Sequence, residues 1–253
     1  MRTQLHFSKR IRFPALRQKI VLINYFSGIP VQSDTISLES FYLSRNDCML
    51  TLYDNLGSGN GYKVRLLLTL LGIPFMRVDK SVTNGETRLP DYLAINPNGR
   101  VPAVVLDDGR ILAESNAILL YFAEGTPYLP SDKFARAQVN QWLFFEQYSH
   151  EPYIAVLRFW RHYLDTLTPI QEARVPELLD KGHAALKLMD THLNGRRFLV
   201  EDCYSVADIA LYAYTHVAGE GGFDLASYPH LNVWLNRVQI VPGHISIDQP
   251  CGA

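Results

Sequence analysis

The sequence has few cysteines, no long apolar run and no excess of either charge. Its three cysteines, Cys48, Cys203 and Cys251, show no CxxC or other metal-ligand spacing, so we expect neither structural disulfides nor a metal site. A reducing, cytoplasmic location fits this cysteine usage best. No apolar run approaches the roughly 20 residues that a transmembrane helix requires. We therefore expect no membrane partner.

The charge balance gives no indication of a nucleic-acid partner. The 253 residues carry 24 Lys and Arg against 25 Asp and Glu, for a formal net charge of -1. With 47% hydrophobic residues, the composition is that of an ordinary globular protein, and the chain is long enough for one or two domains. A general affinity for nucleic acid or for anionic membranes is therefore not expected.

The first 48 residues differ from the rest of the chain. Acidic residues are missing before Asp34, whereas Lys and Arg are frequent near the start. A basic, acid-poor start resembles a transit peptide, but no clear cleavage site accompanies it. We interpret residues 1–48 as a basic extension that is disordered or not part of the true protein, because Met49 directly precedes a strand-like segment and could itself be the start.

From Met49 onward the pattern predicts a strand, a helix and a second strand. Residues 49–53 alternate in polarity, and apolar residues then recur at helical spacing up to the Gly72 and Pro74 stop signals. Residues 75–78 form the second predicted strand. A series of this size predicts a right-handed βαβ unit with two parallel strands.

Residues 96–115 predict a β-hairpin that leads into a helix. The apolar run 101–106 is followed by an Asp-Asp-Gly turn, and residues 110–113 return along it. A helix is predicted at 115–124, with Ile118, Tyr121 and Phe122 facing inward. Because only about 5–6% of X-Pro bonds in folded proteins are cis, the dipeptide Val101-Pro102 taken alone favours a trans bond.

Two motifs carry a family resemblance. Residues 96–102 match a turn of the form N-P-x-G-x-V-P, and residues 114–118 match an E-S-x-A-I signature. Together with the βαβ-ββα order, they resemble the cytosolic glutathione S-transferase family, in its serine-type, bacterial-like form, over roughly four-fifths of the chain. The resemblance implies a fold of two consecutive domains, of which the first is α+β and the second is all-α. A thioredoxin-like, glutathione-binding domain is expected at 49–126, and an all-helical domain that contributes the electrophile pocket at 133–248.

The resemblance implies where glutathione binds. In the family the V-P bond is cis and the valine pairs through its backbone with the cysteinyl part of glutathione, so we expect a cis bond between Val101 and Pro102. Glu114 would then hold the γ-glutamyl ammonium, and Ser115 its carboxylate, at a helix N-terminus that favours an anion. Without a ligand, Ser115 would be an N-cap and Glu114 a solvated loop acid.

Family position also gives two basic candidates for the glycyl carboxylate of glutathione. These are Arg100 and Lys80, of which an arginine suits bidentate carboxylate pairing. Each of them could equally be an ordinary surface charge.

Glutathione conjugation requires a thiolate, whereas a free thiol with a pKa near 8.5 is mostly protonated at neutral pH. Ser58 stands between the first strand and the first helix, and its spacing to Val64 matches that of the catalytic serine in serine-type members. Tyr53 is the alternative, because other members use a tyrosine at the end of this strand. Ser58 could also be a simple N-cap. The loop has no cysteine, which disfavours disulfide exchange through a protein thiol.

The second half is expected to be helical, as the resemblance requires. A long helix is predicted from Lys133 toward His162, bent at Pro152 because proline deletes a helix hydrogen bond. Residues 205–208 predict a capping box in which Asp208 is structural. An aromatic stretch in this half is expected to contribute either to packing or to the pocket: Tyr148, Tyr153, Phe159, Trp160 and His162. Arg158 lies among these residues and is a candidate for attracting an anionic substrate.

The resemblance thus implies a glutathione transferase, expected to be a homodimer, that uses glutathione as a cosubstrate and a small hydrophobic electrophile as its second substrate. Two alternatives remain open at this point. One is a glutathione-dependent peroxidase or disulfide reductase on the same fold. The other is a non-catalytic binding or scaffold protein, because a fold alone does not determine a function.

Overall fold

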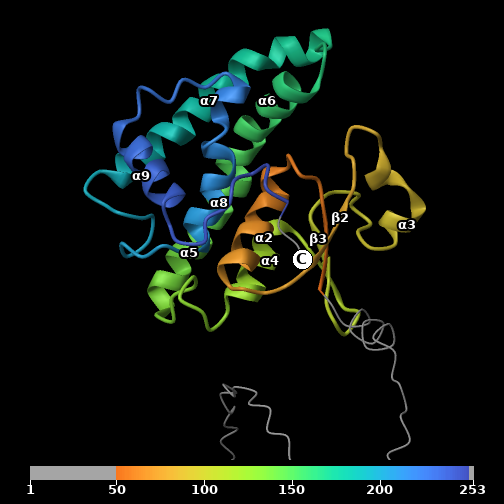
Figure 1. Cartoon of the computed structure of the whole chain (residues 1–253). Coiled ribbons are helices and arrows are strands. Elements are labelled where there is room, and N and C mark those ends of the chain that lie inside the picture. Colours follow the sequence, from red (N-terminus) through yellow and green to blue (C-terminus); the bar gives the residue numbers. More distant parts are fainter. Residues whose placement is uncertain (1–49, 251–253) are drawn as a thin grey trace, which may run out of the picture.

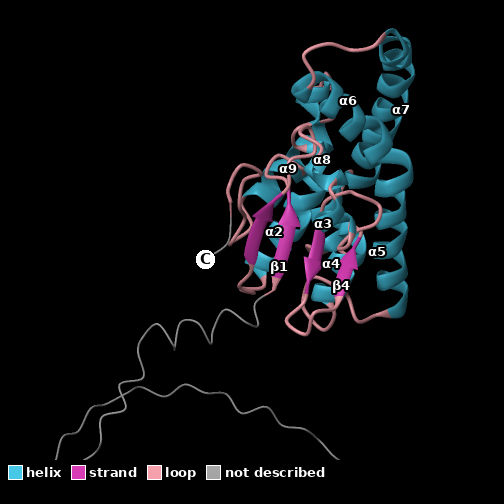
Figure 2. Ribbon diagram, turned by 90° about the vertical axis from the view of Figure 1, so that its right-hand side faces the viewer, coloured by secondary structure: helices cyan, strands magenta, loops and turns pink. Residues whose placement is uncertain are grey.

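The computed structural model describes residues 50–250. The basic extension expected at 1–48 therefore lies outside the described residues, as do Cys48 and Cys251, whereas Cys203 is an exposed free thiol. The described chain begins with a small sheet and its helices and continues as a helical half (Figure 1, Figure 2). Within the described residues, no helix is both long enough and apolar enough to span a membrane.

The sheet is mixed and has the order β2-β1-β3-β4. Its strands are β1 (Thr51–Asp54), β2 (Met76–Asp79), β3 (Ala103–Val105) and β4 (Ile111–Ala113). β1 and β2 are parallel, as predicted for a βαβ unit. β3 pairs antiparallel with β1 and with β4, which is the predicted hairpin.

Two helices cover one face of the sheet and separate it from the helical half (Figure 1). They are α2 (Gly59–Leu70) and α4 (Ser115–Ala123), and both contact α8 (Val206–Thr215). A 3-10 turn (Glu86–Arg88) and α3 (Pro90–Leu93) lie beyond the opposite face. The core beneath α2 and α4 includes Leu52, Val104 and Ile118, all fully buried.

The inward orientation predicted for Tyr121 is wrong. Its side chain is 47% exposed, whereas Ile118 on the same helix is fully buried and Phe122 packs partly against the core. Tyr121 stacks edge-on against Phe122 instead. Adjacent helical positions point about 100° apart, so the two aromatic residues do not share one buried face.

The helical half begins with a helix that changes its winding once. α5 (Lys133–Phe145) continues through a π turn (Glu146–His150) into α6 (Glu151–Tyr163). The long helix predicted from Lys133 toward His162 is therefore present, with a π turn immediately before Glu151 and Pro152, where a bend was predicted. α7 (Pro169–Leu193), α8, a 3-10 turn (Ala218–Gly221) and α9 (Pro229–Gln239) complete this half.

The predicted capping box is present at the start of α8. Asp208 is fully buried and accepts hydrogen bonds from the backbone amides of Leu199 and Ser205, each at 3.0 Å, and from Trp234 Nε1 at 2.9 Å. Burial raises the pKa of Asp208 to about 6, although these hydrogen bonds oppose the rise. The carboxylate therefore joins three separate segments around the most buried helix of this half.

The segment after α9 returns to the first half of the chain. Tyr62 donates a hydrogen bond to the carbonyl oxygen of Ile245 at 2.8 Å, and Arg65 donates to that of Ile247 at 2.9 Å. The Arg65 guanidinium also pairs with Asp54 at 2.7 Å and donates to the Leu56 carbonyl at 2.6 Å. The end of β1 and the following loop are therefore tied to α2 and to the C-terminal segment.

We predict that Asp208→Ala lowers the free energy of unfolding by about 3 kcal/mol, because it leaves several buried donors without an acceptor. Chemical denaturation measures the loss. Asp132→Ala is the matched control, since Asp132 caps α5 at an exposed site and its loss costs about 1 kcal/mol. Equal losses in the two variants would contradict a special role for the buried carboxylate.

Candidate functional site

A cleft of about 550 Å³ lies between the two halves. One wall comes from the loop between β1 and α2 and from the segment before β3, and the other comes from α6 and α8. The lining residues of both walls include Gly57, Ser58, Asn60, Arg100, Val101, Glu151, Arg158, Phe159, Trp160, Tyr163 and Tyr214.

Three of the residues expected at the site line this cleft, namely Ser58, Arg100 and Val101. The bond between Val101 and Pro102 is cis, and Pro102 itself is buried. Ser58 is the N-cap of α2, where its Oγ accepts from the Gly61 amide at 3.3 Å. This contact uses an oxygen lone pair and leaves the hydroxyl hydrogen as a donor.

Two other candidates lie away from the cleft walls. Tyr53 packs its ring against Tyr92, with centroids 5.9 Å apart, and is not among the lining residues. Lys80 forms an ion pair with Asp91 at 3.1 Å and likewise does not line the cleft. The structure therefore favours Ser58 over Tyr53, and Arg100 over Lys80, for a ligand in the cleft.

Glu114 and Ser115 mark the start of α4, as the sequence predicts. Glu114 is exposed and has a φ of 69°, a backbone conformation that non-glycine residues rarely adopt and that is concentrated at functional sites. Glu114, and not Ser115, is the N-cap residue, and it makes no side-chain capping bond. The buried Ser115 Oγ instead donates to Asn60 Oδ1 at 3.2 Å.

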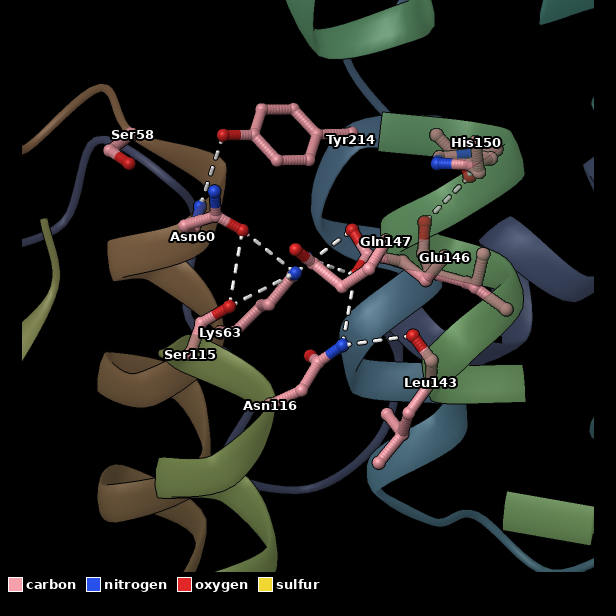
Figure 3. Close-up of polar contacts among 12 residues, drawn as sticks. Ser58, Asn60, Lys63, Ser115, Asn116, Leu143, Glu146, Gln147, His150 and Tyr214 are labelled. Atoms are coloured by element: carbon pink, nitrogen blue, oxygen red, sulfur yellow. Dashed lines mark hydrogen bonds and ion pairs between the residues drawn. The ribbon is translucent and has the colours of Figure 1, made fainter. Parts of the chain in front are cut away.

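Asn60 is a cleft residue that the sequence did not single out (Figure 3). Its Oδ1 accepts from Lys63 Nζ at 2.8 Å and from the Ser115 hydroxyl, and its backbone amide donates to the Tyr214 hydroxyl at 3.3 Å. Because both donors hold Oδ1, the amide nitrogen Nδ2 is the end of Asn60 that can donate to another acceptor, and its interaction with the Glu151 carboxylate, also on the cleft wall, lowers the pKa of that group. The sequence signal that could have identified Asn60 was its position in the first turn of α2, two residues after Ser58.

Lys63 and Glu146 form a completely buried ion pair beneath Asn60. Lys63 Nζ and Glu146 Oε1 are 2.9 Å apart, and both side chains are 0% exposed. Glu146 also accepts from Asn116 Nδ2 at 3.0 Å and from Gln147 Nε2 at 2.8 Å. The pair joins α2 in the first half to the π turn in the second (Figure 3).

His150 lies on the same π turn as Glu146. It is fully buried, and its Nε2 is 2.9 Å from the Thr215 hydroxyl. Burial lowers the pKa of His150 to about 4, although the nearby Glu146 charge opposes this. The histidine is therefore neutral at neutral pH. Within residues 50–250, no group of three or more His, Cys, Asp or Glu side chains is arranged to hold a metal ion.

Gly57, next to Ser58, is held by two residues of α6. Its carbonyl oxygen accepts from Arg158 Nη1 at 2.7 Å and from the Tyr163 hydroxyl at 3.1 Å. A Cβ at this position would overlap the Tyr163 hydroxyl, so a larger residue would require the Tyr163 side chain to shift and would disturb this contact. Arg158 also pairs with Glu220 at 2.6 Å. Its guanidinium group therefore helps to fix the loop beside the cleft, and its attraction for an anionic substrate stays a prediction.

The aromatic residues of the second half divide into two groups. Phe159, Trp160 and Tyr163 line the cleft, whereas Tyr148 is 83% exposed and is not a lining residue. Tyr153 and His162 are also absent from the cleft walls. The apolar wall opposite the Ser58 loop is therefore built by the C-terminal turns of α6.

We predict that Glu146→Gln lowers the free energy of unfolding by about 3–5 kcal/mol, because the Lys63 charge then stays buried without a counter-charge. Combining it with Lys63→Met should recover part of this loss. The exposed pair Lys181 and Glu177 provides the control: Glu177→Gln should cost less than about 1 kcal/mol. A loss at Glu146 as small as that at Glu177 would contradict the burial of the pair.

We further predict a pH effect that is specific to His150. Its native pKa of about 4 lies below the ordinary value of 6.5, so the unfolded state binds the extra proton first as the pH falls. Between pH 6.5 and 4 the wild type should lose up to roughly 3 kcal/mol of stability relative to His150→Gln. Urea denaturation of both proteins across this range measures the difference. A constant difference would show that His150 does not titrate on unfolding.

Comparison with known proteins agrees with the resemblance carried by the motifs. The family models described as "Glutathione S-transferase, N-terminal domain" and "Glutathione S-transferase, C-terminal domain" match residues 49–124 and 143–240. A crystal structure of a glutathione S-transferase from Pseudomonas fluorescens is 47% identical, with a TM-score of 0.76, and the match covers 79% of this chain and 98% of that chain.

A second group of relatives carries a different description. The "Transcriptional regulator URE2" of Saccharomyces cerevisiae is 30% identical over 234 residues, which are 77% of this chain and 66% of that protein. The solved structure of Ure2p in complex with S-hexylglutathione is 25% identical, with a TM-score of 0.70, over 78% of this chain and 96% of that chain. The predicted fold class is confirmed, and the chain belongs to the glutathione S-transferase family.

Proposed function

We propose that this protein is a glutathione transferase that binds glutathione in the cleft and stabilises its thiolate for attack on a small hydrophobic electrophile. The observation that carries the proposal is the convergence of Ser58, Asn60 and Val101 on one cleft whose opposite wall is aromatic. Family membership supports glutathione as the cosubstrate, and Ure2p has been solved with S-hexylglutathione.

Glutathione is proposed to lie along the wall formed by the first half. The backbone of Val101 would pair with the cysteinyl unit, and Arg100 would pair with the glycyl carboxylate, with Lys80 as the second candidate. The γ-glutamyl group would lie at the start of α4, with its ammonium on Glu114 and its carboxylate on Ser115. A helix N-terminus favours this carboxylate, and the buried Lys63 adds a positive charge close to Ser115.

Two donors are proposed to stabilise the thiolate. The Ser58 hydroxyl is the first, because it lines the cleft at the N-terminus of α2, where the helix dipole also favours an anion. The Asn60 amide is the second, because Lys63 and Ser115 fix its oxygen and thereby orient its nitrogen. Both act by preorganised hydrogen bonding and require no proton transfer from the enzyme.

One alternative function has a specific observation in its favour. A relative that is 30% identical is named a transcriptional regulator, which fits a binding role on this fold. Glutathione binding without a lowered thiol pKa would support this alternative. We also propose a homodimer and a cytoplasmic location, on the basis of the family resemblance and of a composition without bias toward membranes.

We predict that bound glutathione has a thiol pKa below 8.5 and that Ser58→Ala raises it by about one unit or more, since a hydrogen bond to a charged group contributes about 1.5–3 kcal/mol. The rate of conjugation to 1-chloro-2,4-dinitrobenzene at neutral pH should fall about tenfold. Ultraviolet titration of the thiolate and steady-state kinetics measure the two effects.

Asn60→Ala is tested in parallel, and Ser227→Ala, at an exposed loop position, is the matched serine control. If Ser58→Ala behaves like the control while Asn60→Ala raises the thiol pKa, the amide is the main donor. An unshifted thiol pKa in the wild type would refute the proposed activation even if glutathione binds tightly.

A further inference from the structure

Tyr214 of α8 lies against the first turn of α2, the helix that Ser58 caps. It lines the cleft, yet the residue is only 7% exposed. Its hydroxyl oxygen accepts a hydrogen bond from the Asn60 backbone amide at 3.3 Å (Figure 3). A Cβ placed on Gly59 would lie 2.6 Å from the Tyr214 ring, so the ring packs directly on the backbone of this turn. The helical half therefore contacts the part of α2 that carries the proposed thiolate donors.

The bond to Tyr214 completes a set of contacts that hold Asn60 at both ends. The side-chain oxygen of Asn60 accepts from Lys63 Nζ at 2.8 Å and from the Ser115 hydroxyl at 3.2 Å. These two bonds fix the outer end of the side chain, and the bond to Tyr214 fixes the backbone from which the side chain departs. A donor is held in one direction when its own conformation is locked by such supporting contacts.

The Tyr214 hydroxyl keeps its hydrogen over the pH range in which a thiol titrates. Burial, followed by the charge of Glu151, raises the pKa of Tyr214, and the opposing effects of Asn60 and Arg158 are smaller. The Lys63 ammonium lies 5.9 Å from the centroid of the Tyr214 ring. The neutral phenol thus supports Asn60 without adding a negative charge beside a bound thiolate. The charged groups around it come from α2, the π turn and α6: Lys63, Glu146, Glu151 and Arg158.

We propose that Tyr214 is a positioning residue for the thiolate, which acts by holding Asn60 so that its amide nitrogen is directed at the bound sulfur. The proposal rests on the proposed function, in which Asn60 is one of two donors to the thiolate. Tyr214 contacts the donor and not the sulfur, unlike the direct role considered for Tyr53 on β1. A tyrosine of the helical half would then tune the nucleophile that the first half binds.

Tyr214→Phe removes the hydroxyl group and keeps the ring that packs on Gly59. We expect the pKa of the bound glutathione thiol to rise by about half a unit, as the loss of one supporting hydrogen bond allows. Conjugation to 1-chloro-2,4-dinitrobenzene should slow about threefold at a pH below the thiol pKa, where the thiolate fraction depends on that pKa. At a pH about two units above the thiol pKa, the two rates should agree within about 1.5-fold. A loss of folded protein would instead slow the reaction equally at every pH.

A double-mutant cycle tests whether the effect passes through Asn60. In the Asn60→Ala background, Tyr214→Phe should change the thiol pKa by less than about 0.2 unit, because the side chain that Tyr214 positions is gone. In the Ser58→Ala background, the rise of about half a unit should remain. Ultraviolet titration of glutathione bound to each full-length variant measures the thiol pKa.

The matched control is Tyr212→Phe, which removes the hydroxyl of another buried tyrosine of α8. Tyr212 does not line the cleft, so the thiol pKa should stay at its wild-type value. An unchanged or lowered thiol pKa in Tyr214→Phe would overturn the proposal. A rise of equal size in the Asn60→Ala background would also overturn it, because Tyr214 would then act by another route. A wild type that binds glutathione without lowering its thiol pKa below 8.5 would refute the proposed function itself.

Discussion

The buried ion pair between Lys63 and Glu146 is the contact on which the joining of the two halves and the candidate site both depend. Burying two charges costs several kcal/mol per ion, and only close geometry with further hydrogen bonds offsets that cost. Here the pair is 2.9 Å apart, and Asn116 and Gln147 occupy the second carboxylate oxygen. On the other side, Lys63 donates to Asn60 and Ser115. The Lys63 charge that stabilises the interface therefore also orients the side chains of Asn60 and Ser115.

The π turn explains how Glu146 reaches this position. The backbone amide of Glu151 donates to the Glu146 carbonyl, which is a wider turn than that of an α-helix. Pro152 follows at once and has no amide hydrogen to continue the regular pattern. Glu146 and His150 are both fully buried, whereas Gln147 and Tyr148 between them are exposed. Glu151 follows the turn directly and lines the cleft, so this irregular segment contributes one acid to the interface and another to the cleft wall.

Sequence reasoning succeeded where the signal is local. The position of Ser58 before α2, the hairpin between β3 and β4 and the capping box of α8 each depend on neighbouring residues, and all three are found. It missed Asn60 and the partnership of Lys63 with Glu146, because these depend on packing between segments far apart in the chain. A lysine on a helix is ordinarily solvated, and nothing in the spacing of residues 59–70 indicates a buried acid opposite it.

The loop that carries Ser58 owes its shape to segments from the far end of the sequence. Arg158 and Tyr163 hold the Gly57 carbonyl from α6, and Arg65 connects the Leu56 carbonyl to the C-terminal segment through Ile247. The first half alone contains the residues proposed to bind glutathione, but not the contacts that fix the backbone on both sides of that loop. Because preorganised donors must be fixed before a reaction, the proposed activation of the thiol depends on the helical half as well as on the first half.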